Sequence, residues 1–337
     1  MKRKLKSAYF KILILLEYSM MSLLLILLAG FFITLVVAPS VIKKEKQAGI
    51  VGKDMHKPNK PEVANMGGLS VAIGFCAAIL LAIALNTFFE LEFNLIFVMA
   101  GLITILIINL MGVFDDLFKI RQSVKAVLPL FAAIPLIAVS VGTTTMGIPF
   151  IGPVDFGIFY VLALVPLGVA VASNLTNMLA GFNGNEVGMG IIIFLTASYI
   201  AFINNQIDAL IISLAMLGSL IAFLKFNWYP AKAFPGDVLN LMIGCTLAVV
   251  VIIGNFETVG FILMLPYVID WFIKAKNGFP KTFAIFNSKD GKLYVPKGKI
   301  RGLADLILTK TNGMTERNLT ITLIGIEIIF AVIAVAI

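Results

Sequence analysis

The feature that most constrains this chain is a succession of long apolar segments separated by short polar loops. Each segment runs for about 18 to 25 residues, the length that an α-helix needs to cross the hydrocarbon core of a bilayer. With 60% hydrophobic and only 13% charged residues, the composition excludes a soluble domain. The sequence therefore predicts an all-α, polytopic membrane protein of about ten transmembrane helices, built as one domain over residues 1–337.

The predicted spans are placed by hydropathy, with ends good to about three residues. They are 15–38, 67–86, 94–114, 124–142, 157–174, 188–204, 208–224, 237–254, 258–273 and 318–337. Four prolines fall inside spans, which membrane helices tolerate because neighbouring helices satisfy the freed backbone groups; they are Pro129, Pro135, Pro166 and Pro266. The segment 274–317 is predicted to form a long basic loop. Within it, the alternation of polar and apolar residues around 292–295 predicts a short strand or hairpin.

The polar loops alternate in charge. Lys and Arg gather in one set of loops, which are 39–66, 115–125, 225–236 and 274–317, and are missing from the other set, which are 87–93, 143–156, 205–207 and 255–257. The positive-inside rule places the first set in the cytoplasm. The basic residues within 1–11 do not fit ten spans, and an interfacial amphipathic helix ahead of the first span would account for them. The placement of this terminus stays open.

The net charge of +8 is a property of these loops and not of a folded basic surface. This distribution favours a lipid bilayer and anionic substrates as partners, and we expect no nucleic acid. Cys76 and Cys245 both lie inside apolar segments, so we interpret them as small core residues and not as a disulfide or metal pair. The single histidine, His56, excludes a histidine-rich metal site.

Two adjacent carboxylates, Asp115 and Asp116, follow directly after the apolar segment 94–114. Ionisable groups at membrane depth are costly, so such a pair indicates a functional site. Adjacent carboxylates repel each other unless a cation lies close, and either Lys119, Lys125 or a divalent metal would serve. A solvated helix end that caps the next segment is the alternative for these residues taken alone.

Amide and carboxylate side chains recur in two further loops of the same side. Asn174 and Asn177 are three residues apart and therefore share a helix face. Carboxamides ligate hard cations or read the edge of a nucleobase. Asp237 is expected to cap the helix that begins there. Together with Asp115, Asp116 and Asn177 it would form an oxygen-rich site suited to Mg²⁺, although a plain polar turn is the alternative for the asparagines.

These patterns occur in order along nearly the whole chain. They are Asp115-Asp116 with Lys125 ten residues beyond Asp115, Asn174-x-x-Asn177-x-x-Ala180-Gly181-x-Asn183-Gly184-x-Glu186, Asn227-Trp228-Tyr229-Pro230, Phe234-Pro235-Gly236-Asp237 and Thr315-Glu316-Arg317-Asn318-Leu319-Thr320. The combination resembles the polyprenyl-phosphate N-acetylhexosamine-1-phosphate transferases. It is most similar to the eukaryotic and archaeal branch that forms dolichyl-diphosphate-GlcNAc, because the histidine-rich stretch of the bacterial branch is missing.

The resemblance implies a role for each matched residue. Asn177 and Asp237 would hold Mg²⁺, with Mn²⁺ as a substitute, on the pyrophosphate of the donor. Asp115 and Asp116 would be catalytic, near the lipid phosphate; whether one of them attacks covalently or only positions the acceptor stays open. The substrate-binding residues would be Lys125, Asn174, Gly181, Asn183, Phe234, Lys281 and Lys57, of which Gly181, Asn183 and Phe234 would hold the uracil.

The implied reaction transfers GlcNAc-1-phosphate from UDP-GlcNAc to dolichyl or polyprenyl phosphate and releases UMP. It would take place at the cytoplasmic face of a prokaryotic plasma membrane, most consistent with an archaeon, under the loop 274–317. Another UDP-N-acetylhexosamine stays open, because the family's sugar-contacting Pro-Arg-His-Arg run is Pro280-Lys281-Thr282-Phe283 here. A homodimer is also left open.

A cation or nucleotide-sugar transporter is the alternative from another functional class. Transporters tend to place their sites at the bilayer midplane within broken helices and to show an inverted repeat. The sequence shows no convincing repeat, and its carboxylates gather on one side of the membrane. This one-sided arrangement favours an enzyme, and it also disfavours a purely structural membrane scaffold.

Overall fold

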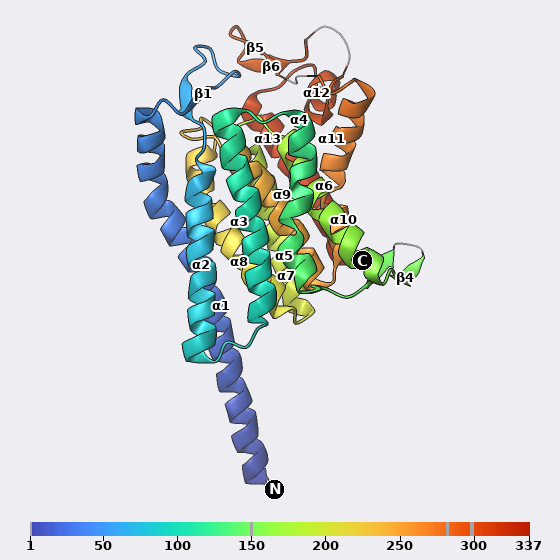
Figure 1. The fold of residues 1–337 in the computed structure, drawn as a ribbon. Coiled ribbons are helices and arrows are strands. Elements are labelled where there is room, and N and C mark those ends of the chain that lie inside the picture. The colour runs from blue at the N-terminus through green and yellow to red at the C-terminus, as the bar shows by residue number, and fades with distance from the viewer. Residues whose placement is uncertain (1, 149–150, 281–282, 297–299) are drawn as a thin grey trace.

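The computed structural model describes residues 2–148, 151–280, 283–296 and 300–337, and for residues 2–19 it describes the helical backbone. Long helices run side by side in alternating directions and form one bundle (Figure 1). The strands of the described residues are confined to three two-stranded antiparallel hairpins. The prediction of an all-α, polytopic membrane protein is confirmed.

The elements follow one another with short connections. The helices are α1 (Lys2–Gln47), α2 (Gly68–Phe89), α3 (Leu95–Phe118), α4 (Gln122–Ala132), α5 (Ile134–Ala138), the π-helical turn η1 (Tyr160–Leu164), α6 (Val165–Met178), α7 (Asn185–Ile203), α8 (Ile207–Asn227), α9 (Gly236–Gly254), α10 (Glu257–Leu263), α11 (Leu265–Lys276), α12 (Leu303–Lys310) and α13 (Glu316–Ala336). The hairpins are β1 (Val51–Lys53) with β2 (Glu62–Ala64), β3 (Thr145–Ile148) with β4 (Gly152–Asp155), and β5 (Ile285–Asn287) with β6 (Lys292–Tyr294).

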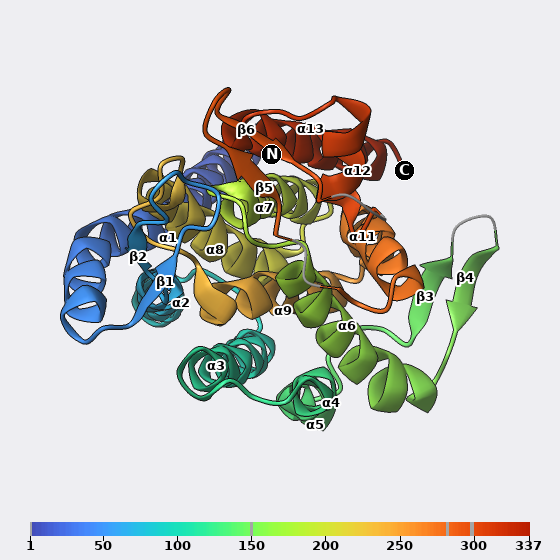
Figure 2. The same cartoon turned by 90° about the horizontal axis from the view of Figure 1, so that it is seen from above.

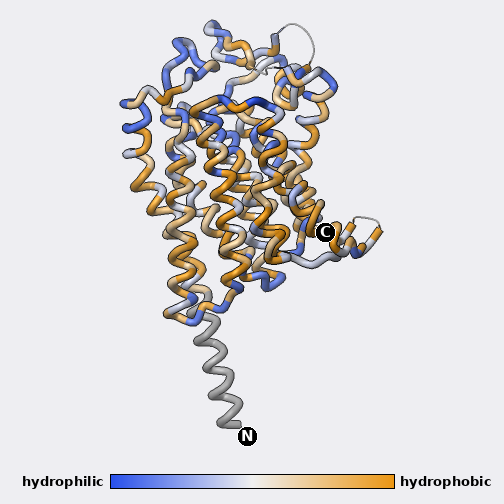
Figure 3. Tube along the Cα trace, in the orientation of Figure 1, coloured by the Kyte–Doolittle hydropathy of each residue, from blue (hydrophilic) through white to orange (hydrophobic). Residues whose placement is uncertain are grey.

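One end of the bundle carries β1–β2, β5–β6 and α12, and we call it the polar end. Figure 3 shows that hydrophilic residues gather there, whereas the shafts of the helices are mainly hydrophobic. The hairpin β5–β6 confirms the strand predicted around residues 292–295. The helix α12, in the same connection, was not predicted.

Eight of the described helices are long and apolar enough to span a membrane, and the pair α10–α11 would make a ninth. The span predicted at 124–142 differs, because α4 and α5 are separated at Ala133 and the structure ends α5 at Ala138. Pro135 explains the break, since it has no N–H to donate to the carbonyl of Phe131. Pro266 acts in the same way at the 54° bend between α10 and α11.

Helix α9 lies at the centre of the bundle, where it contacts α2, α3, α6, α7 and α8 (Figure 2). All of its residues from Val238 to Gly254 are buried. Because its first turn lies at the polar end, α9 carries Asp237 to the middle of that end. The helices α3 and α6 run further than predicted, so that Asp115, Asp116 and Asn177 belong to the last turns of helices that pack against α9.

Candidate active site

A polar cavity of about 370 Å³ lies at the polar end of the bundle. Its walls come from the loop between α1 and α2, from the ends of α3 and α6, and from the start of α9. Among the predicted site residues it is lined by Asp116, Asn177, Gly181, Phe234 and Asp237. Side chains more than a hundred residues apart in the sequence therefore meet in one cavity.

Close packing of α3 on α9 brings the two carboxylates of α3 to this cavity. A Cβ atom on Gly112 would lie 2.5 Å from the Cα atom of Val238 and 2.7 Å from the carbonyl oxygen of Asp237. Only glycine fits where the backbones approach this closely. Gly112, one turn before Asp115 and Asp116, thus sets the distance between these carboxylates and the first turn of α9.

Asp115, Lys125 and Asp237 form a cluster across three helices. The Lys125 ammonium pairs with the carboxylates of both Asp115 and Asp237. Asp115 also accepts a hydrogen bond from the backbone N–H of Ile120 at 2.9 Å, which shapes the turn into α4. Asp237 was expected to cap α9, but the helix begins one residue earlier, at Gly236, and the Asp237 side chain turns to Lys125 instead.

Asp116 faces the N-terminus of α9. Its Oδ2 accepts a hydrogen bond from the backbone N–H of Val238 at 3.2 Å, and its Oδ1 accepts one from the amide of Asn65 at 3.4 Å. Gly236, with a φ of +71°, allows this approach, because a Cβ there would lie 2.5 Å from Asp116 Oδ2. The positive end of a helix dipole stabilises a carboxylate in this position.

Amide oxygens complete an oxygen-rich wall beside Asp237. Asn240 donates from Nδ2 to Asn177 Oδ1 at 3.2 Å, and both residues line the cavity. Asn240 Oδ1 is buried and carries no hydrogen bond among the described residues, which leaves an oxygen free for a cation. Carboxylate and amide oxygens are the ligands that Mg²⁺ takes in proteins, so the residues present fit a divalent cation.

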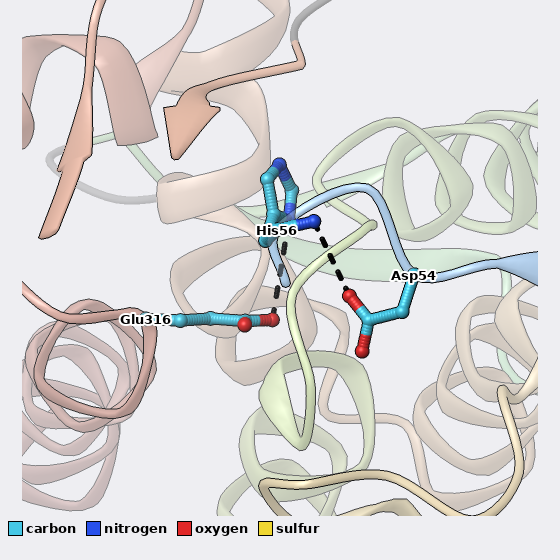
Figure 4. A group of neighbouring side chains, drawn as sticks. All are labelled: Asp54, His56 and Glu316. Atoms are coloured by element: carbon cyan, nitrogen blue, oxygen red, sulfur yellow. Dashed lines mark hydrogen bonds and ion pairs between the residues drawn. The ribbon is translucent and has the colours of Figure 1, made fainter. Parts of the chain in front are cut away.

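A second cluster lies beside the cavity, where the loop before α2 meets the start of α13. Asp54, His56 and Glu316 bring one donor atom each to within 4.8 Å of one another (Figure 4). Lys57 already supplies a cation here, because its ammonium lies 3.1 Å from Asp54 and pairs with Glu316. It also lies 4.2 Å from the centroid of the Tyr229 ring. These ion pairs hold the loop to α13.

Asn183 is the centre of the second cluster. Its Nδ2 donates to Asp54 at 3.0 Å and to Glu316 at 2.9 Å, and its Oδ1 accepts from the backbone N–H of Ala231 at 2.7 Å. Its backbone carbonyl accepts from Thr320 at 3.0 Å. The side chain is buried and does not line the cavity, so in this conformation it joins three loops and contacts no substrate space.

His56 lies at the border between the second cluster and the cavity. Its imidazole stacks on Phe182, with ring centroids 4.9 Å apart and planes 14° apart. Desolvation by burial lowers the pKa of His56 to about 4, against the opposing charge of Asp54. The imidazole is therefore neutral at physiological pH.

Not every predicted site residue reaches the cavity. Lys57 is buried in the second cluster, and Asn174 donates its amide to the carbonyl of Ala170 in its own helix at 2.8 Å. Lys125 touches the cavity only through Asp237. Lys281 lies outside the described residues. For these residues a substrate contact stays a prediction.

Three residues that line the cavity were not selected as site residues. Asn240 lies one turn after Asp237 on the same helix face, and this spacing is the signal that could have found it. Glu186 accepts a hydrogen bond from the backbone N–H of Gly181, and its Oε2 is buried with no partner in the part of the chain that the structure describes. Asn65 holds Asp116, and no local pattern around it indicates this role.

Comparisons with known proteins agree with this geometry. The profile of the family described as glycosyl transferase family 4 matches residues 96–255. A Saccharolobus solfataricus protein, provisionally named UDP-N-acetylglucosamine–dolichyl-phosphate N-acetylglucosaminephosphotransferase, is 38% identical over 317 residues, which cover 94% of this chain and 96% of the relative. The Dictyostelium discoideum protein of that name is 27% identical over 356 residues, covering 89% of this chain and 86% of the relative. A phospho-N-acetylmuramoyl-pentapeptide-transferase of Streptococcus mutans is 29% identical over 262 residues, covering 72% and 75%.

Proposed function

The chain belongs to glycosyl transferase family 4, and from this membership we propose that it transfers GlcNAc-1-phosphate from UDP-GlcNAc to dolichyl phosphate. The products are dolichyl-diphosphate-GlcNAc and UMP. The family resemblance seen in the motifs is confirmed by the relatives, and several of them carry the name of this reaction. The observation that carries the proposal is the cavity in which Asp116, Asn177 and Asp237 converge.

The reaction joins two anions. An oxygen of the lipid phosphate attacks the β-phosphorus of UDP-GlcNAc, a new P–O bond forms, and the bond between the β-phosphorus and the bridging oxygen breaks, so that the electron pair leaves with UMP. Positioning and charge neutralisation supply most of the catalysis in transfers of this kind. Lys125 and the N-terminus of α9 supply positive charge at this place.

Asn177 and Asp237 would hold a Mg²⁺ ion, with Asn240 as a further oxygen donor. When bound, such an ion neutralises phosphate charge and aligns the attacking and leaving oxygens. Asp116 is held by Val238 and Asn65 and lines the cavity, where we place it near the acceptor phosphate. The buried Oδ1 of Asn240, which has no partner among the residues described, supports the cation.

An apolar groove supports a lipid acceptor. It has a volume of about 340 Å³ and lies between η1–α6, α9 and the bent pair α10–α11. Its polar members are few, chiefly Tyr160 and Glu257, which hydrogen-bond to each other. The groove reaches Leu175 on α6, less than one turn from Asn177, so a prenyl chain lying in it would bring its phosphate toward the cavity.

The protein is an integral membrane protein, and we place the polar end on the cytoplasmic side of an archaeal plasma membrane. The loops of that end carry the Lys and Arg residues, whereas the described loops of the opposite end, 90–94, 204–206 and 255–256, carry none. UDP-sugars are soluble cytoplasmic donors, so this orientation gives them access to the cavity. Pairing into a homodimer stays a prediction.

The test uses the purified protein in detergent with Mg²⁺, dolichyl phosphate and UDP-GlcNAc, and measures UMP. We expect UMP release that stops on addition of EDTA and returns with excess Mg²⁺ or Mn²⁺. A panel of other UDP-N-acetylhexosamines tests the sugar. Absence of UMP with every donor in the panel would disprove the proposed function, and activity unchanged by EDTA would disprove the metal.

A further inference from the structure

Lys274 extends from α11 to the end of α6, the helix that carries Asn177. Its ammonium donates a hydrogen bond to the backbone carbonyl of Met178, the last residue of α6. The last carbonyls of a helix have no partner within it, and a positive charge at this end also interacts favourably with the helix dipole. Lys274 is buried and is not one of the residues that line the polar cavity. Its contact is therefore with the backbone of α6.

Asp270 holds the ammonium in this place. It lies one turn before Lys274 on α11, and its Oδ2 is 2.7 Å from Lys274 Nζ. Its Oδ1 accepts a hydrogen bond from the backbone N–H of Leu303, the first residue of α12, at 2.8 Å. Replacing a buried ion pair by apolar residues often leaves stability unchanged. Stability alone therefore does not account for this pair, whereas its bond to α6 gives it a place beside the site.

The residue before Asn177 is anchored as well, to α9. Thr176 Oγ1 donates a hydrogen bond to the backbone carbonyl of Asn240 at 2.7 Å. The two helices touch here, because a Cβ atom on Gly244 would lie 2.1 Å from the carbonyl oxygen of Ala172. Asn177 thus lies between two anchored neighbours, and its Oδ1 meets the amide of Asn240 at 3.2 Å.

The end of a helix frays most easily, because its last residues have the fewest backbone hydrogen bonds. We propose that Lys274 is a positioning residue: by holding the carbonyl of Met178 it fixes the last turn of α6, and so holds Asn177 at the cation site. A group that orients a metal ligand raises the affinity for the metal. This inference rests on the proposed function, because the cation would lie on the pyrophosphate of the donor.

Two variants remove the bond to α6. Lys274→Met leaves Asp270 buried without its cation, so the second variant combines Lys274→Met with Asp270→Asn, which removes both charges and keeps an acceptor for Leu303. Asn277→Ala is the matched control, because Asn277 joins the end of α11 to the carbonyl of Ile300 at 2.8 Å instead of to α6. Thermal melting verifies that each variant is folded.

The first measurement is the binding of UDP-GlcNAc by calorimetry on the purified protein without acceptor, once with Mg²⁺ and once with EDTA. The ratio of the two dissociation constants is the Mg²⁺ effect. Loss of a group that orients a metal ligand costs about 10- to 100-fold in metal affinity. The Mg²⁺ effect should therefore fall by about tenfold or more in both Lys274 variants and stay unchanged in Asn277→Ala.

The second measurement needs no metal. Amide hydrogen exchange in residues 175–180 reports the opening of the last turn of α6. It should become faster in both Lys274 variants and keep the wild-type rate in Asn277→Ala.

A double-mutant cycle tests whether Lys274 acts through Asn177. Asn177→Ala removes the metal ligand, so adding Lys274→Met to it should change the Mg²⁺ effect no further. A direct effect of the Lys274 charge on the donor would instead lower the Mg²⁺ effect or the donor affinity again in this background, and would overturn the positioning role.

The outcomes separate this inference from the proposed function. If wild type does not bind UDP-GlcNAc, the proposed function fails and the inference falls with it. If wild type binds UDP-GlcNAc but Mg²⁺ does not strengthen the binding, the cation site and the inference are both wrong. If the Lys274 variants keep the wild-type Mg²⁺ effect, or if Asn277→Ala loses it equally, the positioning role is wrong while the transferase function stands.

Discussion

Two carboxylate pairs near the polar end are each bridged by one lysine, and their surroundings differ. The two units are Asp115–Lys125–Asp237 and Asp54–Lys57–Glu316. The side chain of Asp237 is 26% exposed and lines the cavity, whereas the side chains of Asp54 and Glu316 are 4% and 2% exposed. A lysine beside open space can exchange a carboxylate for a phosphate. A lysine sealed between carboxylates holds the fold, and removing one partner leaves a buried charge.

In this protein, residue type and spacing alone do not distinguish a substrate-binding lysine from a structural one. Lys57 and Lys125 were both predicted to contact substrate. The first is packed under Tyr229 between carboxylates that are only 4% and 2% exposed, whereas the second contacts Asp237, whose side chain is 26% exposed. Substitutions in the two units test this difference.

The largest effect is expected for Asp237→Asn. The variant keeps the size of the side chain but removes a charge that would hold the cation and Lys125. Loss of one preorganised electrostatic group lowers turnover by about a hundredfold to a thousandfold. The measurement is the rate of UMP release, with melting temperature as the control for folding. Activity within a factor of three of wild type would remove Asp237 from the site.

The matching change in the buried unit Asp54–Lys57–Glu316 is Lys57→Met. It leaves Asp54 and Glu316 buried without their cation, which costs about 3 kcal/mol of folding stability. Lys125→Met should cost less, because one of its two partners, Asp237, is 26% exposed and the other, Asp115, keeps the hydrogen bond from the backbone N–H of Ile120. Thermal melting in detergent compares the two variants directly. A larger loss of stability in Lys125→Met would reverse the assignment of the two units.

The folding stability of the protein should also depend on pH through His56, which lies beside Asp54 and Glu316. The pKa of His56 is about 4 in the folded protein and about 6.5 in the unfolded chain. Between these values the unfolded chain binds a proton that the folded protein does not, so stability is complete above pH 6.5 and falls as the pH decreases toward 4. From pH 7 to pH 5 the loss from this group is about 2 kcal/mol. His56→Phe has no imidazole to protonate at this position, and its melting temperature should therefore fall less than that of wild type over this range.

The smallest effect is the coupling between Lys57 and Glu316. The double variant Lys57→Met with Glu316→Met removes both charges, so its loss of stability should be smaller than the sum of the single losses by about 1 to 3 kcal/mol. The measurement is a double-mutant cycle of melting free energies. Additive losses would show that the two side chains do not depend on each other, and the unit would then not be a structural ion pair.

Much of the site could be predicted from the sequence because its parts lie at helix ends. Asp116, Asn177 and Asp237 each lie in the first or last turn of an apolar helix, and hydropathy alone places those turns on one side of the membrane. Asn65, Asn240 and Glu186 were missed as site residues because their roles depend on neighbours from other helices. The break of the fourth span at Ala133 was missed because neighbouring helices can compensate for the N–H that Pro135 lacks, and the sequence does not show whether they do.

Hydropathy and loop charge are enough to identify this chain as a helical membrane protein whose acidic and amide motifs share one side. Hydropathy acts locally and requires no knowledge of contacts. Which of these side chains faces the cavity depends on how the helices and loops pack against one another. Asn183 turns inward to Glu316 and His56 stands at the cavity wall, because each buried polar group must find a partner and the partners come from segments far apart in the chain.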